Sequence, residues 1–325
     1  MTDLNTLTLP DLYTDLARTG FVRRLLELAR DEDLGLPRPG RKPLDGDVTS
    51  AAGIEPSVAG AADLAVRQQG TIAGLAIIPD LLEVFGTAAR WTPHAEDGER
   101  VAAATCLGRL DGPLAEILSV ERTLLNIVAR LSGVATRTAE FVAKLDGLPT
   151  RLLDTRKTTP GMRVLEKYAV RCGGGFCHRI GLHDALLIKD NHIAGIPPDR
   201  LAAVVHAAIN RAREAAAKNS SGGEGAESGG LRFAEVEVDS LDQLRALLAS
   251  GGAGADIILL DNMSAAMLRE AVRLRNESGN NVLLEASGGV RLDTVRALAE
   301  TGVDRISVGG LTHQAVSIDL GLDVV

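Results

Sequence analysis

The first residues of the chain carry apolar side chains at helical spacing. Residues 8–30 predict a helix that ends at Arg30, with an apolar face formed by Leu16, Val22, Leu25, Leu26 and Leu28. A stretch rich in proline and glycine follows, and its end at Gly46–Ser50 is predicted to make a turn.

The next part of the chain changes from helical spacing to short apolar runs. Residues 61–78 predict short strands with a turn at Gln69-Gly70, and 79–85 predict a brief helix. A strand pair is expected from 100 to 110, with Asp111-Gly112 as its turn. Together these elements predict an α+β module of about 110 residues.

A longer helix is predicted to begin near Ser119 and to end at Ser132-Gly133. Its buried face is marked by four apolar residues at helical spacing: Leu124, Ile127, Val128 and Leu131. Arg122 lies on another face, where the pattern alone indicates no more than a solvated side chain.

From residue 148 onward, apolar and β-branched runs alternate with helical segments. The runs are 152–154, 185–189, 233–238, 257–261, 282–286 and 306–308. Continuous apolar runs joined by helices predict parallel strands that are buried on both faces. One insertion, Lys218–Gly230, is rich in Gly, Ser and Glu and is predicted to be a flexible surface loop.

Nearly all of these predicted strands end in a polar residue. The residues are Asp154, Lys189, Glu237, Asp261 and Ser287. In an α/β barrel the carboxyl ends of all strands converge on one mouth, where barrel enzymes hold their sites. The pattern therefore favours a closed or nearly closed barrel over an open sheet.

Cationic residues are concentrated in one segment of an acidic chain. Residues 151–189 contain eight Lys/Arg against three Asp/Glu, a balance of +5 within a formal charge of -8, so the rest sums to -13. A basic run on a helix is commonly a solvated face. Arg156-Lys157, His178-Arg179 and Lys189, however, each follow an apolar run, which indicates a site for a small, highly charged anion.

The composition sets limits on the class of protein. The 325 residues are 45% hydrophobic and 24% charged, as in ordinary globular proteins, and no apolar run reaches the length of a membrane span. The negative charge and 2% aromatic content argue against a nucleic-acid surface. Three sparse cysteines fit a reducing cytoplasm, and the spacing of Cys172, Cys177 and His178 matches no common zinc pattern.

Two glycine-rich turns follow the last two predicted strands. Ser287-Gly288-Gly289 and Gly309-Gly310 stand between a strand and a predicted helix, so bare backbone N–H groups would face outward. Barrels commonly bind phosphate at the end of their last strands. Glu237 and Asp261 add oxygen ligands that suit Mg2+. The pattern implies a ligand set of a phosphate, a metal-bound polyphosphate and carboxylates.

Several motifs, in order along the chain, resemble the quinolinate phosphoribosyltransferase family. They are DTRKTTPGMRVLEKYAVRCGGGFCHRIGL, LIKDNHI, EVEVDSLDQL, ILLDNM, LLEASGGV and ISVGGLTH, with GDVTS and SVERTLLNIVARLSGVAT before them. The resemblance implies transfer of ribose 5-phosphate from phosphoribosyl pyrophosphate (PRPP) to quinolinate. Pyrophosphate and CO2 would leave, and nicotinate mononucleotide would form for de novo NAD biosynthesis.

The resemblance also implies roles for individual residues. Quinolinate would contact Arg156, His178, Arg179 and Lys189, and also Arg122 of the neighbouring subunit of a homodimer. Lys157 would bind pyrophosphate, and Glu237 and Asp261 would hold ribose hydroxyls and Mg2+. The 5'-phosphate loop would contain Ser287, Gly288, Gly289, Gly309 and Gly310, and His313 matches a further family position. Lys157, Lys189, Glu237 and Asp261 would be the catalytic residues.

The fold implied in this way is α/β, an incomplete TIM-like α/β barrel preceded by an α+β open-faced sandwich domain. The expected division is an N-terminal domain at 1–118, a connecting helix at 119–147 and a catalytic barrel at 148–325, with the C-terminal end of the chain packing back onto the first domain. The expected location is the cytoplasm, without membrane or nucleic-acid partners.

Three other functions stay open at this point. A related transferase could use another acceptor, although Arg156 with His178-Arg179 favours a diacid. A Schiff-base aldolase could use Lys189 as its nucleophile, although the neighbouring cations favour an anion site. A non-catalytic anion-binding protein would bind tightly without releasing pyrophosphate.

Overall fold

The computed structural model describes residues 3–36, 39–40, 42–220 and 230–325, and it divides into two compact units. The barrel unit contains the described residues of Met1–Asn5, Glu140–Lys157 and Gly175–Gly310. The sandwich unit contains those of Thr6–Ala139, Thr158–Gly174 and Leu311–Val325. The domain limits expected from the sequence stay a prediction.

Six parallel strands form the sheet of the barrel unit. They are β6 (Arg151–Leu153), β7 (Leu186–Ile188), β8 (Ala234–Val238), β9 (Ile257–Asp261), β10 (Leu283–Ser287) and β11 (Arg305–Ser307). Their order is β6-β11-β10-β9-β8-β7, so β6 and β7 form the two edges of an incomplete barrel. The parallel α/β fold predicted from the sequence is confirmed.

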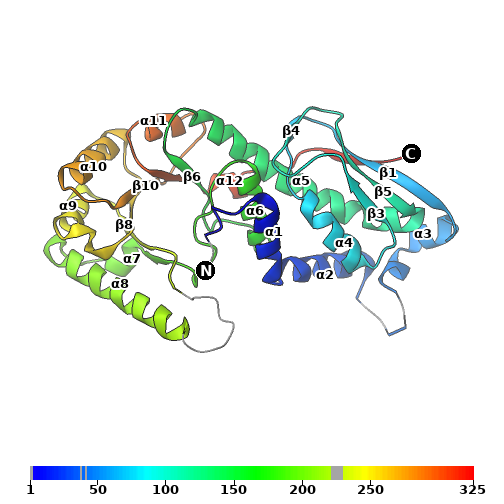
Figure 1. The fold of residues 1–325 in the computed structure, drawn as a ribbon, viewed down its shortest axis with the longest axis horizontal. Coiled ribbons are helices and arrows are strands. Elements are labelled where there is room, and N and C mark those ends of the chain that lie inside the picture. The colour runs from blue at the N-terminus through cyan, green and yellow to red at the C-terminus, as the bar shows by residue number, and fades with distance from the viewer. Residues whose placement is uncertain (1–2, 37–38, 41, 221–229) are drawn as a thin grey trace. The chain divides into compact units, whose positions relative to one another are not determined.

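Helices cover the outer face of this sheet. The elements between and after the strands are α7 (Asp190–Ile193), α8 (Pro198–Ser220), α9 (Leu241–Ala249), η3 (Gly251–Gly254), α10 (Ala265–Glu277) and α11 (Val295–Ala299). Figure 1 shows α8 to α11 outside the curved row of strands. All five residues of β8 are buried, as a strand between helices and a filled barrel interior requires.

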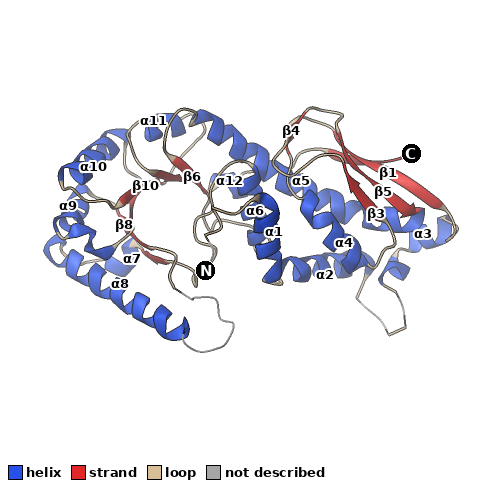
Figure 2. Cartoon of the chain, in the orientation of Figure 1, coloured by secondary structure: helices blue, strands red, loops and turns tan. Residues whose placement is uncertain are grey.

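The sandwich unit is built on an antiparallel sheet with the order β12-β1-β5-β3, whose strands are drawn in red in Figure 2. Its strands are β1 (Ala59–Val66), β3 (Arg90–Pro93), β5 (Cys106–Pro113) and β12 (Leu320–Val324), and β2 (Gly70–Thr71) pairs separately with β4 (Arg100–Val101). The C-terminal strand β12 pairs with β1.

Several helices belong wholly or largely to the sandwich unit. They are α1 (Leu9–Arg18), α2 (Phe21–Leu34), η1 (Pro43–Gly46), α3 (Val48–Gly53), η2 (Leu75–Ile77), α4 (Ile78–Phe85), α5 (Leu114–Lys144), α6 (Arg163–Cys172) and α12 (Gly310–His313). The brief helix predicted at 79–85 is confirmed as α4. Within the described residues, no helix combines the length and the apolar character that crossing a membrane requires.

Two helix predictions were wrong, because a glycine can either interrupt a helix or allow close packing inside one. The single helix predicted over 8–30 is divided into α1 and α2 at Gly20, which has a φ of 74°. The helix predicted to end at Ser132-Gly133 continues to Lys144 as α5. A Cβ on Gly133 would lie 2.2 Å from the Val316 carbonyl oxygen, so this glycine permits close packing and does not end the helix.

Two predicted turns are regular elements instead. Asp111-Gly112 lies inside β5, where a Cβ on Gly112 would lie 2.7 Å from Ala89 Cα. The turn expected at Gly46–Ser50 instead contains the start of α3, because Asp47 accepts the backbone N–H groups of Thr49 and Ser50 at 3.1 and 2.9 Å.

The predicted insertion loop is only partly described. Lys218–Ser220 belong to α8, so the expected loop begins later than the sequence suggested. Residues 221–229 of the expected loop lie outside the described residues.

Candidate active site

The carboxyl ends of the strands bring polar residues to one end of the barrel unit, the barrel mouth. Asp154 follows β6 and Lys189 follows β7. Glu237, Asp261 and Ser287 lie at or next to the ends of β8, β9 and β10. Asp261 pairs in register with Ser287, which fixes the two strand ends side by side. Five polar strand ends identified from the sequence therefore lie along one edge of the sheet.

One lysine and two carboxylates form the acidic side of the mouth. Lys189 Nζ lies 2.6 Å from Glu237 Oε2. Burial and the charge of Glu237 raise the pKa of Asp261, although the side chain of Asn262 donates to it at 2.6 Å. A divalent cation would relieve this excess of negative charge, and carboxylate oxygens are ligands that Mg2+ prefers. The donor set fits the expected Mg2+.

The turn after β10 is shaped by the turn after β9. Gly288 has a φ of 93°, and a Cβ there would lie 2.1 Å from Asn262 Oδ1. Asn262 also has a positive φ of 54°, and its N–H donates to the Ser287 carbonyl at 2.8 Å. Gly289 has a φ of 60° and an exposed position. The backbone of this tight turn is therefore not covered by side chains. A phosphate loop requires this, because the phosphate contacts backbone N–H groups.

Two arginines form the cationic side of the barrel unit. Arg179 is only 7% exposed, and its Nη1 donates to the Ala185 carbonyl at 3.3 Å. Burial and the charge of Arg156 lower the pKa of Arg179. Arg156 Nε is buried and has no hydrogen-bond partner within the described part of the chain. Two neighbouring guanidinium groups of this kind would suit an anion such as a carboxylate.

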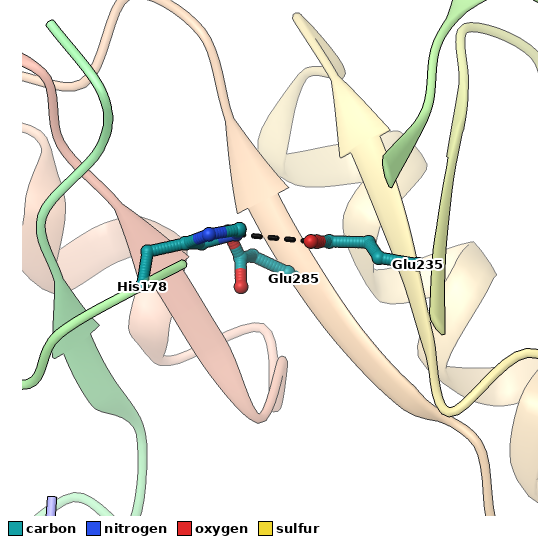
Figure 3. Close-up of side chains that lie close together, drawn as sticks. All are labelled: His178, Glu235 and Glu285. Carbon is teal, nitrogen blue, oxygen red and sulfur yellow. Dashed lines mark ion pairs between the residues drawn. The ribbon is translucent and has the colours of Figure 1, made fainter. Parts of the chain in front are cut away.

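His178 is buried inside the barrel, with both ring nitrogens facing other groups. Its Nε2 lies 2.9 Å from Glu235 Oε2 and 3.4 Å from Glu285 Oε1. Figure 3 shows the three side chains close together. Its Nδ1 accepts the backbone N–H of Arg179 at 2.8 Å. A contact between this ring and a substrate stays a prediction.

Burial and the neighbouring carboxylates have opposite effects on the pKa of His178. Burial disfavours the imidazolium, but the charges of Glu285 and Glu235 outweigh it and raise the pKa of His178 to about 10. The hydrogen bond from Arg179 requires a lone pair on Nδ1. An imidazolium, which the raised pKa favours at neutral pH, has no such lone pair. Because the Arg179 N–H lies 2.8 Å from Nδ1 and keeps its proton, the geometry is that of the neutral ring with its proton on Nε2, and the raised pKa reflects the pull of the two carboxylates on that proton.

Three residues of this interior cluster were missed in the sequence. Glu235 and Glu285 are fully buried, and Arg305 Nε donates to Glu285 Oε2 at 2.7 Å. Burial opposes the charge of Glu285, but His178 and Arg305 outweigh it and lower its pKa to about 2. Acidic residues inside apolar strands were the available signal, because a buried carboxylate requires partners.

The remaining predicted residues lie in different places. Lys157 is exposed, and its backbone N–H donates to Thr155 Oγ1 at 3.0 Å in the loop after β6. Gly309 and Gly310 follow β11 in the barrel unit. Arg122, exposed on α5, and His313, exposed on α12, belong to the sandwich unit.

Comparison with known proteins gives two matching family models. The model described as "Quinolinate phosphoribosyl transferase, C-terminal domain" matches residues 134–323. The model described as "Quinolinate phosphoribosyl transferase, N-terminal domain" matches residues 47–132.

Individual proteins are similar over most of the chain. A probable nicotinate-nucleotide pyrophosphorylase [carboxylating] of Bacillus subtilis (strain 168) is 39% identical over 279 residues, covering 86% of this chain and 88% of that protein. The nicotinate-nucleotide pyrophosphorylase [carboxylating] of Mycobacterium leprae (strain TN) is 40% identical over 280 residues, with coverages of 86% and 91%. The solved structure of the nicotinate-nucleotide pyrophosphorylase from Francisella tularensis matches with a TM-score of 0.78 and 34% identity over 100% of both chains.

Proposed function

The chain belongs to the quinolinate phosphoribosyltransferase family and is a nicotinate-nucleotide pyrophosphorylase (carboxylating) of de novo NAD biosynthesis, and we propose that its barrel mouth is the site of this reaction. In this reaction the ring nitrogen of quinolinate displaces pyrophosphate from C1' of PRPP. Loss of CO2 and addition of a proton from solvent at C2 then give nicotinate mononucleotide.

The arginine pair is the observation that carries the assignment of the site. Arg156 Nε is buried and pairs with none of the residues that the structure describes, and burial and the charge of Arg156 lower the pKa of Arg179. A planar dicarboxylate would neutralise both guanidinium groups through paired hydrogen bonds. In our proposal Arg156 and Arg179 hold the two carboxylates of quinolinate, with His178 beside them and Lys189 between quinolinate and pyrophosphate.

PRPP occupies the rest of the mouth in this proposal. Glu237 and Asp261 hold the ribose hydroxyls and Mg2+, and Lys157 binds the pyrophosphate. The 5'-phosphate lies against the backbone of the turns after β10 and β11, formed by Ser287, Gly288, Gly289, Gly309 and Gly310, with His313 as a further contact. The crowding of Gly288 by Asn262 supports this placement, because it leaves no room for a side chain.

The transfer step separates charge, which explains why the site contains both cationic and anionic side chains. Cleavage at C1' builds positive charge on the ribose and negative charge on the leaving oxygens. Lys157 and Lys189 stabilise the leaving group, and Glu237 and Asp261 favour the developing ribose cation. Bound Mg2+ supplies further charge neutralisation to the pyrophosphate.

Decarboxylation follows because the pyridinium nitrogen can accept the electrons left at C2. We propose that a less polar position for the C2 carboxylate, with its charge only partly neutralised, favours this loss. A substrate complex with a solvent-exposed C2 carboxylate would contradict this part of the proposal.

A homodimer completes the proposed site. Arg122 is exposed on α5, and we propose that it reaches quinolinate in the neighbouring subunit.

We place the enzyme in the cytoplasm, where its three free cysteines stay reduced.

The test is a coupled assay with quinolinate, PRPP and Mg2+ that follows pyrophosphate and CO2 together. We expect equal amounts of both products and no turnover with nicotinate in place of quinolinate. Turnover with nicotinate alone would indicate a transferase for another acceptor. Tight binding of both substrates without pyrophosphate release would indicate an anion-binding protein.

The aldolase alternative has a separate test. Lys189 forms a 2.6 Å ion pair with Glu237, and an ammonium group held in this way is not a nucleophile. We expect no covalent adduct after borohydride treatment with a carbonyl substrate, and a trapped adduct on Lys189 would contradict the assignment.

A further inference from the structure

The interior of the barrel unit contains two buried carboxylates, beside His178, to which the proposed reaction gives no role. Glu235 and Glu285 are fully buried, and His178 is 5% exposed. Within the described part of the chain, the Glu235 carboxylate forms one ion pair, with the His178 ring, and its oxygens have no hydrogen-bond partner. A buried carboxylate is costly unless it is paired, so its presence requires an explanation.

The His178 ring connects these carboxylates to the main chain of Arg179. One side of the ring, Nε2, faces Glu235 at 2.9 Å, and the other side, Nδ1, accepts the Arg179 N–H at 2.8 Å. The preceding peptide is also held, because the His178 N–H donates to Asp154 Oδ1 at 2.7 Å. The backbone from which the Arg179 side chain departs is thus fixed at two consecutive N–H groups.

The second carboxylate has a partner of its own. Arg305 Nε donates to Glu285 Oε2 at 2.7 Å, and Phe233 lies edge-on to the His178 ring with a centroid distance of 5.4 Å. Glu285 therefore pairs with Arg305 as well as facing the ring at 3.4 Å, whereas the ring is the one ion-pair partner of Glu235 among the described residues and is closer to it.

A metal ion is the competing explanation for this cluster. The potential ligand atoms of His178, Glu235 and Glu285 lie within 4.8 Å of one another. The proton on Nε2 and the guanidinium of Arg305, however, already occupy the positions that a cation would take. The cluster therefore resembles an orienting network more than a metal centre.

We propose that Glu235 is a positioning residue, which orients the His178 ring so that Nδ1 holds the Arg179 main chain and aims its guanidinium at the substrate dicarboxylate. His178 then acts through Arg179 and not as a direct ligand of quinolinate. This inference rests on the proposed function, because it takes quinolinate as the anion that Arg179 binds.

The first test replaces the Glu235 carboxylate. Glu235→Leu removes the acceptor and keeps a similar volume, so we expect the KM for quinolinate to rise by about 10- to 100-fold, with the KM for PRPP nearly unchanged. Glu235→Gln keeps an oxygen acceptor for Nε2–H and should restore most of the affinity. The control is Ile257→Val, which alters a buried residue in register with Glu235 and should leave both KM values unchanged.

A second pair of variants keeps the test decisive if Glu235→Leu fails to fold. His178→Asn retains an oxygen close to the position of Nδ1, whereas His178→Leu removes every acceptor. Positioning through Nδ1 predicts a lower KM for quinolinate in the Asn variant than in the Leu variant. A direct contact between Nε2 and quinolinate predicts equal defects in both.

The outcomes separate this inference from the proposed function. Wild-type protein that releases no pyrophosphate from quinolinate and PRPP would overturn the proposed function. An active wild type with an unchanged quinolinate KM in Glu235→Leu would overturn the positioning role alone. One equivalent of tightly bound metal per chain that is lost in Glu235→Gln would overturn it in favour of a metal centre.

Discussion

Two arginines of the barrel unit are held in an arrangement that is unfavourable without a ligand. The charge of Arg156 and burial lower the pKa of Arg179, and Arg156 Nε is buried without a partner among the described residues. Such strain is typical of binding sites, where the ligand supplies the missing charge. The shape of the guanidinium groups, and not only their charge, should therefore determine quinolinate binding.

Replacing Arg156 by lysine tests this dependence on shape. Arg156→Lys keeps the positive charge but loses the paired hydrogen bonds of a guanidinium, so we expect the KM for quinolinate to rise by about 10- to 100-fold. The KM for PRPP should change little. Steady-state kinetics with each substrate varied in turn provides the measurement, and equal changes in both KM values would contradict the assignment.

Lys157 should affect turnover more than binding. Lys157→Ala removes a charge that stabilises the leaving pyrophosphate, and we expect kcat to fall by about 100- to 1,000-fold. Because Lys157 is exposed, the thermal unfolding midpoint should stay near that of the wild type. Lys144→Ala, at the exposed end of α5, is the matched control. A kcat near that of the wild type would remove Lys157 from the site.

At the scale of elements, the ends of the strands determine where the side chains of the site lie. The turns that follow determine the backbone conformation around them. The register of β9 with β10 places Asp261 beside Ser287, and the turns that follow are connected through Asn262 and Gly288. The sequence predicted these strand ends because burial in a parallel sheet leaves a local apolar pattern. It did not predict the crowding at Gly288, because that depends on a neighbouring turn.

Gly288→Ala tests the turn after β10. A new Cβ would lie 2.1 Å from Asn262 Oδ1 and at a φ of 93°, so we expect a loss of about 1–3 kcal/mol in the free energy of unfolding. The KM for PRPP should rise more than that for quinolinate. Gly279→Ala is the control, because Gly279 also has a positive φ, of 68°, but has no atom within 4 Å of its Cβ position. Equal effects of both substitutions would contradict a specific role of the turn.

At the scale of the whole molecule, the proposed homodimer makes each site depend on two chains. Arg122 is exposed on α5, and in our proposal it contacts the quinolinate of the neighbouring subunit. Co-expression of Arg122→Ala with Lys157→Ala would produce mixed dimers in which one site contains both wild-type residues. We expect activity of about a quarter of the wild-type value.

The measurement compares this co-expressed mixture with each single variant at equal chain concentration. Recovery above the sum of the two single variants supports a site shared between subunits. Activity equal to that sum would show that Arg122 acts within its own chain or not at all.

The sequence by itself determined the parallel α/β fold, the polar strand ends and the family, because burial periodicity and contiguous motifs are local properties of the chain. It could not determine which glycines end elements, since Gly20 separates two helices whereas Gly133 lies inside one. That difference depends on the packing of distant segments.

Only the tertiary structure decided that Glu235, His178 and Glu285 form one cluster. These residues come from a loop and from two different strands, and their distances depend on the order of strands in the sheet. A carboxylate in an apolar run indicates that a partner is needed, but it does not identify the partner. The charge balance inside the barrel is therefore a property of the folded molecule and not of any one segment.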